Sequence, residues 1–124
     1  MNQLHITLEE NSPAIKWTNT QADRIGARGH VGTHLDCYTT VPEKPEYNIT
    51  AMVLDCQNEM PKEEDIKSLT TLENMALLLH TANLERNEYG TDMYFSTETF
   101  LSEEVLHTIL EKKPLFIIID SHGI

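Results

Sequence analysis

Residues 102–120 have the sequence SEEVLHTILEKKPLFIIID, and this stretch decides the fold class. Ser102 can cap a helix over residues 103 to about 112, because a serine side chain accepts a hydrogen bond from the first helical turn. Pro114 ends that helix, and the apolar run at 115–120 is the strongest strand signal in the chain. Helical spacing predicts a buried stripe made of Val105, Leu106, Ile109 and Leu110.

The regions on the N-terminal side of this stretch extend the same pattern. Residues 75–79 are continuously apolar and predict an inner strand, so residues 75–120 form a strand–helix–strand unit whose two strands should be parallel. Another short apolar run, 51–56, predicts a further buried strand, and 61–69 predicts a helix with proline at its first position. The polar segment 82–94 predicts a loop. The class is therefore α/β, with a mixed sheet and helices.

Two stretches near the N-terminus alternate between apolar and polar residues. This alternation predicts half-buried strands at residues 4–8 and 14–17, the second after a turn signal at 11–13. Residues 21–29 are irregular and precede the segment that carries the candidate chemistry.

Length and charge limit the range of functions. The 124 residues suit one domain spanning 1–124, and a net charge of −11 excludes nucleic acid as a natural partner, because phosphate binding needs lysine and arginine. No apolar run is long enough to predict a membrane span, and the N-terminus lacks the basic and apolar regions of a signal peptide. We therefore expect a cytoplasmic protein. Cys37 and Cys56 are too few for a disulfide framework, and we expect both to be small buried residues.

His30, His34 and Asp36 offer two imidazoles and one carboxylate within seven residues. His34 and Asp36 point the same way from an extended segment, and His30 joins them if the chain folds back at Gly32. Imidazole and carboxylate together suit Zn²⁺ or Mn²⁺. The alternative is a hydrogen-bonded histidine pair beside a turn aspartate, and spacing alone does not decide between the two.

The string His30-Val31-Gly32-Thr33-His34-Leu35-Asp36 resembles the signature of the cyclase family of metal-dependent hydrolases, approximately His-x-Gly-Thr-His-x-Asp-x-Pro-x-His. That family includes bacterial kynurenine formamidases and isatin hydrolase. Further likeness lies in the opening segment 4–8, the helix at 66–69, the strand at 77–81, and the helix–strand–Asp-Ser segment at 100–121.

This resemblance implies that His30, His34 and Asp36 are metal ligands for one or two Zn²⁺ or Mn²⁺ ions, with Asp36 bridging two. It also implies a mixed α/β domain of the swivelling β/β/α kind, assembled as a homodimer or higher homo-oligomer. The implied reaction is metal-assisted hydrolysis of a small amide, of the arylformamidase or cyclic-imide type.

The chain departs from the family pattern after Asp36. The family's proline and a following histidine align with Tyr38 and Thr40, and the family's C-terminal portion, which supplies another histidine and a glutamate, is expected to be lacking. His122 is a candidate ligand or proton shuttle and Tyr38 a candidate for contacting substrate or stabilising an oxyanion, against the alternatives of an exposed histidine and a packed tyrosine. Asp120 could orient a ligand imidazole or form a strand-end hydrogen bond.

These departures leave three functions open. The first is the metal-dependent hydrolase, and the second is a non-catalytic metal-binding or structural homologue that has lost distal ligands. The third, a small-molecule-binding module without metal, requires the likeness over residues 30–36 to be accidental. Self-association is expected in addition, since a shortened sheet would expose an apolar edge and face.

Overall fold

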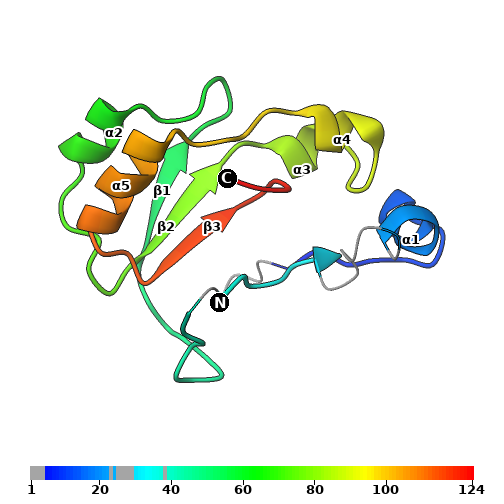
Figure 1. The fold of residues 1–124 in the computed structure, drawn as a ribbon, viewed down its shortest axis with the longest axis horizontal. Helices are drawn as coiled ribbons and strands as arrows, with labels where there is room; N and C mark the ends of the chain where they lie inside the picture. The colour runs from blue at the N-terminus through cyan, green and yellow to red at the C-terminus, as the bar shows by residue number, and fades with distance from the viewer. Residues whose placement is uncertain (1–4, 23, 25–29, 38) are drawn as a thin grey trace.

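The computed structural model describes residues 5–22, 24, 30–37 and 39–124, and it contains a three-stranded parallel sheet (Figure 1). The strands are β1 (Ala51–Asp55), β2 (Ala76–His80) and β3 (Phe116–Ile119), with β2 in the centre. All three coincide with predicted strands, and β2 and β3 pair in parallel as expected. The α/β class is therefore confirmed.

Two crossover helices cover one face of the sheet. Helix α2 (Glu63–Ser68) links β1 to β2, α5 (Glu103–Glu111) lies between β2 and β3, and the two helices lie side by side (Figure 1). The core forms between these helices and the sheet, where five of the described side chains are completely buried: Ile66, Leu72, Leu77, Leu79 and Ile109.

Both crossover helices were predicted, but with errors at particular positions. The Ser102 hydroxyl caps α5 by accepting a hydrogen bond from the Val105 N–H at 3.4 Å, as expected. Leu110, however, is 61% exposed, because it lies about 140° around the helix from Val105, and Thr108 takes the buried position instead. Helix α2 begins at Glu63, so Pro61 precedes the cap at residue 62 and is not the first helical residue.

The segment at 14–17 forms a helix, so the predicted strand there is wrong. Helix α1 (Pro13–Trp17) begins with proline after a capping serine, whose hydroxyl accepts a hydrogen bond from the Ile15 N–H at 3.4 Å. A capping residue and an N-terminal proline therefore outweigh four residues of alternation. A π-helical turn, η1 (Thr18–Ala22), follows. Of the strand predicted at 4–8, residue 4 lies outside the described residues, and 5–8 form no strand.

Two short helices interrupt the predicted loop at 82–94: α3 (Asn83–Arg86) lies within it, and α4 (Asp92–Ser96) begins in it and runs past its end. Thr91 caps α4 by accepting a hydrogen bond from the Tyr94 N–H at 3.2 Å. Helices this short are fixed by caps and tertiary contacts, so apolar periodicity does not reveal them.

Gly90 docks α1 against the turn before α4. Its φ is +89°, and a Cβ atom there would lie 2.3 Å from the Ala14 backbone nitrogen. We expect Gly90→Ala to destabilise the protein by at least the 1–2 kcal/mol or so that a left-handed alanine costs, because the clash adds to the strain. Urea denaturation measures this, with Gly123→Ala as the control, since a Cβ at Gly123 meets nothing within 4 Å. Equal stabilities of the two variants would contradict this account of Gly90.

Two further expectations concern exposure. Cys56 is buried, with 5% of its surface exposed, but Cys37 is exposed, so that part of the cysteine prediction is wrong. Cys37 follows Asp36 in an open segment that no other element covers closely enough to bury a thiol. In the described part of the chain, no helix has both the length and the apolar character needed to cross a membrane.

Candidate metal centre

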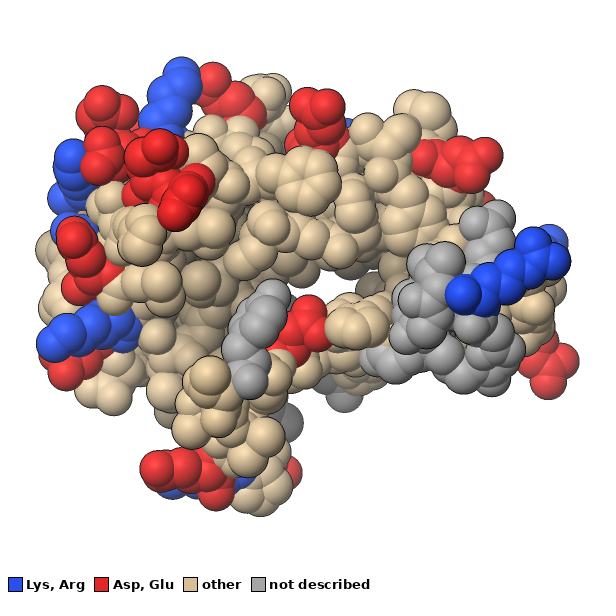
Figure 2. All heavy atoms as spheres, viewed as in Figure 1, with Lys and Arg blue, Asp and Glu red and all other residues tan. Residues whose placement is uncertain are grey.

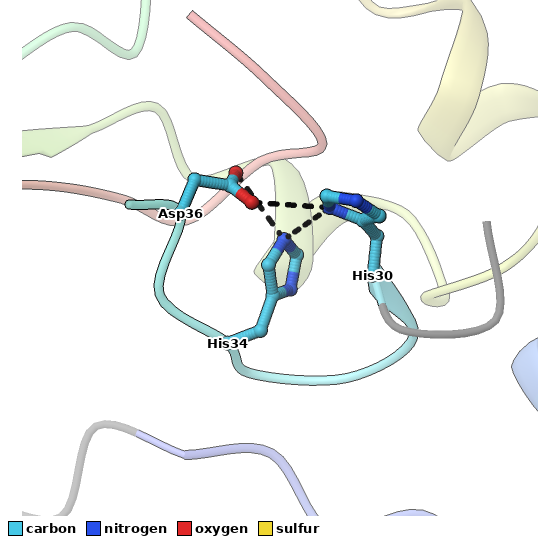
Figure 3. Close-up of side chains that lie close together, drawn as sticks. All are labelled: His30, His34 and Asp36. Atoms are coloured by element: carbon cyan, nitrogen blue, oxygen red, sulfur yellow. Dashed lines mark hydrogen bonds and ion pairs between the residues drawn. The ribbon is translucent and has the colours of Figure 1, made fainter. Parts of the chain in front are cut away.

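The structure brings the two predicted imidazoles and the carboxylate together (Figure 3). His30 Nδ1 lies 3.2 Å from Asp36 Oδ1 and 3.3 Å from His34 Nε2. His34 Nε2 lies 3.5 Å from Asp36 Oδ2. Two ring nitrogens and the two oxygens of one carboxylate thus lie close together.

Gly32 reverses the chain between the first histidine and the other two residues. Its φ is +85°, a conformation that glycine adopts without strain. Beyond the turn, His34 and Asp36 project to the same side of an extended stretch and so face His30 (Figure 3). The fold-back at Gly32 predicted from the sequence is confirmed.

The size of the cluster fits a tetrahedral ion. Ligand atoms about 2.0–2.1 Å from a tetrahedral Zn²⁺ stand about 3.3 Å from one another. The three separations of 3.2, 3.3 and 3.5 Å match that spacing. Three protein groups that could hold an ion are the number typical of catalytic rather than structural zinc sites.

A backbone contact fixes the protonation of one imidazole. His34 Nδ1 lies 2.8 Å from the Gly32 carbonyl oxygen. A carbonyl only accepts hydrogen bonds, so Nδ1 must donate, and in the neutral ring Nε2 then carries the lone pair. Nε2 is the atom that faces His30 and Asp36, so the lone pair of this imidazole points into the cluster.

The cluster is open to solvent. The side chains of His30 and Asp36 are 60% and 56% exposed, and that of His34 is 33% exposed. A small molecule or an ion can therefore reach these side chains directly from solvent. Acidic side chains also spread over the face of the molecule seen in Figure 2, consistent with the net charge of −11, and such a surface favours cations.

The two residues predicted to have a catalytic role are Tyr38 and His122. Tyr38 lies outside the described residues. His122 is exposed and sits among aromatic rings, with centroid distances of 5.8 Å to Tyr94, 5.8 Å to Phe95 and 6.2 Å to Phe100. Partial burial lowers the pKa of His122, against an opposing hydrogen bond with the Tyr94 backbone. Within the described ranges, no hydrogen bond or ion pair joins His122 to the three clustered residues.

Asp120 forms the strand-end hydrogen bonds that were one of its two expected roles. Its Oδ1 accepts from the N–H and hydroxyl of Thr81, and its Oδ2 accepts from the Ala82 N–H, each at 2.7 Å. This carboxylate at the end of β3 therefore holds the turn between β2 and α3. The neighbouring His80 ring pairs with Glu85 at 3.2 Å.

Two contacts that the sequence did not indicate hold the turn at Gly32. The Gly32 N–H donates to the Tyr89 hydroxyl at 2.8 Å, and the Ile6 N–H donates to the Thr33 hydroxyl at 3.1 Å. A pocket of about 420 Å³ lies beside Ile6 and Tyr89, the two partners of this turn. Its lining includes Ile6, Leu8, Pro13, Leu84 and Tyr89. A tyrosine 57 residues away leaves no local pattern by which it could be found.

Comparison with protein families gives one match that spans nearly the whole chain. The model of the family described as "Putative cyclase" matches residues 3–124, which include the clustered histidines and aspartate. Comparisons with curated proteins and with solved structures found no match.

Proposed function

Because the chain belongs to the Cyclase family, we propose that it is a metal-dependent hydrolase of a small amide, of the arylformamidase or cyclic-imide hydrolase type. The observation that carries the proposal is the convergence of the His30, His34 and Asp36 side chains, whose facing nitrogen and oxygen atoms lie 3.2–3.5 Å apart in pairs. These residues would hold Zn²⁺ or Mn²⁺. The chemistry that such an ion supplies when bound is activation of a water molecule and polarisation of the amide carbonyl.

The side chains around the cluster have distinct parts in this proposal. The Gly32 carbonyl keeps the proton of His34 on Nδ1, and the exposure of the cluster admits the amide. His122 is proposed to carry a proton, because its lowered pKa keeps more of its imidazole neutral, and so able to accept one, near neutral pH. Tyr38 is proposed to contact substrate or stabilise an oxyanion, through its place in the sequence two residues after Asp36.

Metal analysis tests the proposal. Protein purified without chelator is expected to retain one to two Zn²⁺ or Mn²⁺ per chain, as measured by elemental mass spectrometry, because the ligand atoms are already in place. The loaded protein is expected to hydrolyse N-formylkynurenine or a cyclic imide, and removal of the metal should stop turnover. Absence of metal binding, with added Zn²⁺ as well as in the purified protein, would rule the hydrolase out.

One observation favours a second candidate, a non-catalytic metal-binding homologue. Thr40 stands where the family pattern has a histidine, and its exposed hydroxyl contacts the Thr39 hydroxyl at 3.4 Å. A threonine cannot act as a general base near neutral pH as a histidine does. Tight metal binding without turnover of either substrate class selects this candidate.

A further inference from the structure

We propose that Tyr89 is a positioning residue that holds the metal ligands in place through the backbone of Gly32. The inference rests on the proposed metal site and adds to it a residue from a distant part of the chain. Tyr89 lies between α3 and α4, and its hydroxyl accepts a hydrogen bond from the Gly32 N–H at 2.8 Å.

Gly32 is held on both of its sides. On one side, the peptide that links it to Val31 donates to Tyr89. On the other side, the peptide that links it to Thr33 accepts from His34 Nδ1 at 2.8 Å. The phenol therefore fixes the orientation of the residue whose carbonyl sets the tautomer of a ligand imidazole. Because Gly32 has φ +85° and no side chain to pack, these two hydrogen bonds are direct restraints on the orientation of its backbone.

Tyr89 is itself firmly placed. Its ring packs edge-on against Tyr94, with centroids 5.0 Å apart, and Tyr94 is 3% exposed. The next residue, Gly90, lies against the backbone of Ala14. The exposed turn at 30–36 is thus tied to a buried part of the molecule. A second hydrogen bond to this turn runs from the Ile6 N–H to the Thr33 hydroxyl. Ile6 belongs to neither the sheet nor a described helix.

Loss of the phenol hydroxyl should leave the ligands present but less well ordered. Ordering the ligand side chains then costs free energy when the ion binds. The affinity for the ion therefore falls although no ligand has been removed. Outer-shell partners of metal ligands typically contribute about 10–100-fold in metal affinity. We expect an effect of that size from Tyr89→Phe, which removes the hydroxyl and keeps the ring packed on Tyr94.

The test compares Tyr89→Phe with Tyr47→Phe. Tyr47 is a matched control, because its hydroxyl also accepts a backbone N–H, from Lys44 at 3.3 Å, while its ring packs on Phe116 of β3 and makes no described hydrogen bond to residues 30–36. Competition titration with Zn²⁺ is expected to give a dissociation constant about 10–100-fold higher for Tyr89→Phe and an unchanged one for Tyr47→Phe. Equal affinities in the two variants overturn the proposal.

A second measurement needs no metal. Nitrogen NMR of the metal-free protein reports which ring nitrogen of His34 carries the proton. Wild type and Tyr47→Phe should show the proton on Nδ1, whereas Tyr89→Phe should show a mixture of the two tautomers. An unchanged His34 tautomer in Tyr89→Phe would contradict the positioning role of Tyr89, even if the wild type binds Zn²⁺. Failure of the wild type to bind Zn²⁺ removes the proposed function instead, and the tautomer still decides the role of Tyr89.

Discussion

His34→Ala is expected to raise the dissociation constant for Zn²⁺ by more than the roughly 100-fold upper range for losing an outer-shell partner. His34 Nε2 is 3.3 Å from His30 Nδ1 and 3.5 Å from Asp36 Oδ2, so its removal leaves two protein ligands where three converge. Hydrolysis that depends on the metal should be lost together with binding. Isothermal titration with Zn²⁺ measures the first effect, and turnover of N-formylkynurenine measures the second.

His107→Ala is the matched control for this substitution. His107 lies on α5, its side chain is 73% exposed, and its nearest charged partner is Glu103 at 3.7 Å. Neither variant should change the stability of the metal-free protein by more than about 0.5 kcal/mol, because neither side chain is part of the core. Zn²⁺ affinity that survives in His34→Ala at the level of His107→Ala would contradict the assignment of His34 as a ligand.

Asp120→Asn is expected to lower the free energy of unfolding by about 1–3 kcal/mol. The carboxylate accepts three hydrogen bonds of 2.7 Å, and the exposed fractions of Thr81 and Ala82, which donate them, are 6% and 1%. Asparagine replaces one acceptor oxygen with a donor, so at least one buried N–H or O–H loses its partner, at about 1–3 kcal/mol for each such group. The turn at Ala82, with φ +58°, also loses support for a strained backbone.

Asp55→Asn is the control for Asp120→Asn. Asp55 ends the neighbouring strand β1, but it is exposed and its Oδ1 accepts the Gln57 N–H at 3.0 Å. Urea denaturation should therefore show a change within about 1 kcal/mol for Asp55→Asn. If both substitutions shift the midpoint equally, the bonds of Asp120 to the turn after β2 do not stabilise the fold as described.

The sheet and its crossover helices could be predicted because they are amphipathic or continuously apolar over many residues. The run at 115–120 and the stripe containing Val105 and Ile109 carry that signal directly. The helix at 13–17 could not be recognised by period, since four residues of alternation also fit a strand. Its docking depends on Gly90, far away in the sequence.

The candidate site was predictable to the extent that it is local. His30, His34 and Asp36 meet because one glycine reverses the chain between them, and spacing conveys that. The contact of Tyr89 with Gly32 is set by the tertiary structure, so nothing in the sequence near either residue indicates it. The choice between the two roles of Asp120 likewise required the positions of Thr81 and Ala82 after β2.

The unequal exposure of the two cysteines gives the molecule a single accessible attachment point. Cys56 is buried, and burial together with nearby carboxylates raises its pKa to about 11, so it offers almost no thiolate at neutral pH. Cys37 is exposed and directly follows Asp36. A thiol-reactive fluorophore therefore attaches beside the ligand cluster without any engineered cysteine. The native sequence thus already carries a place for an optical reporter of metal loading.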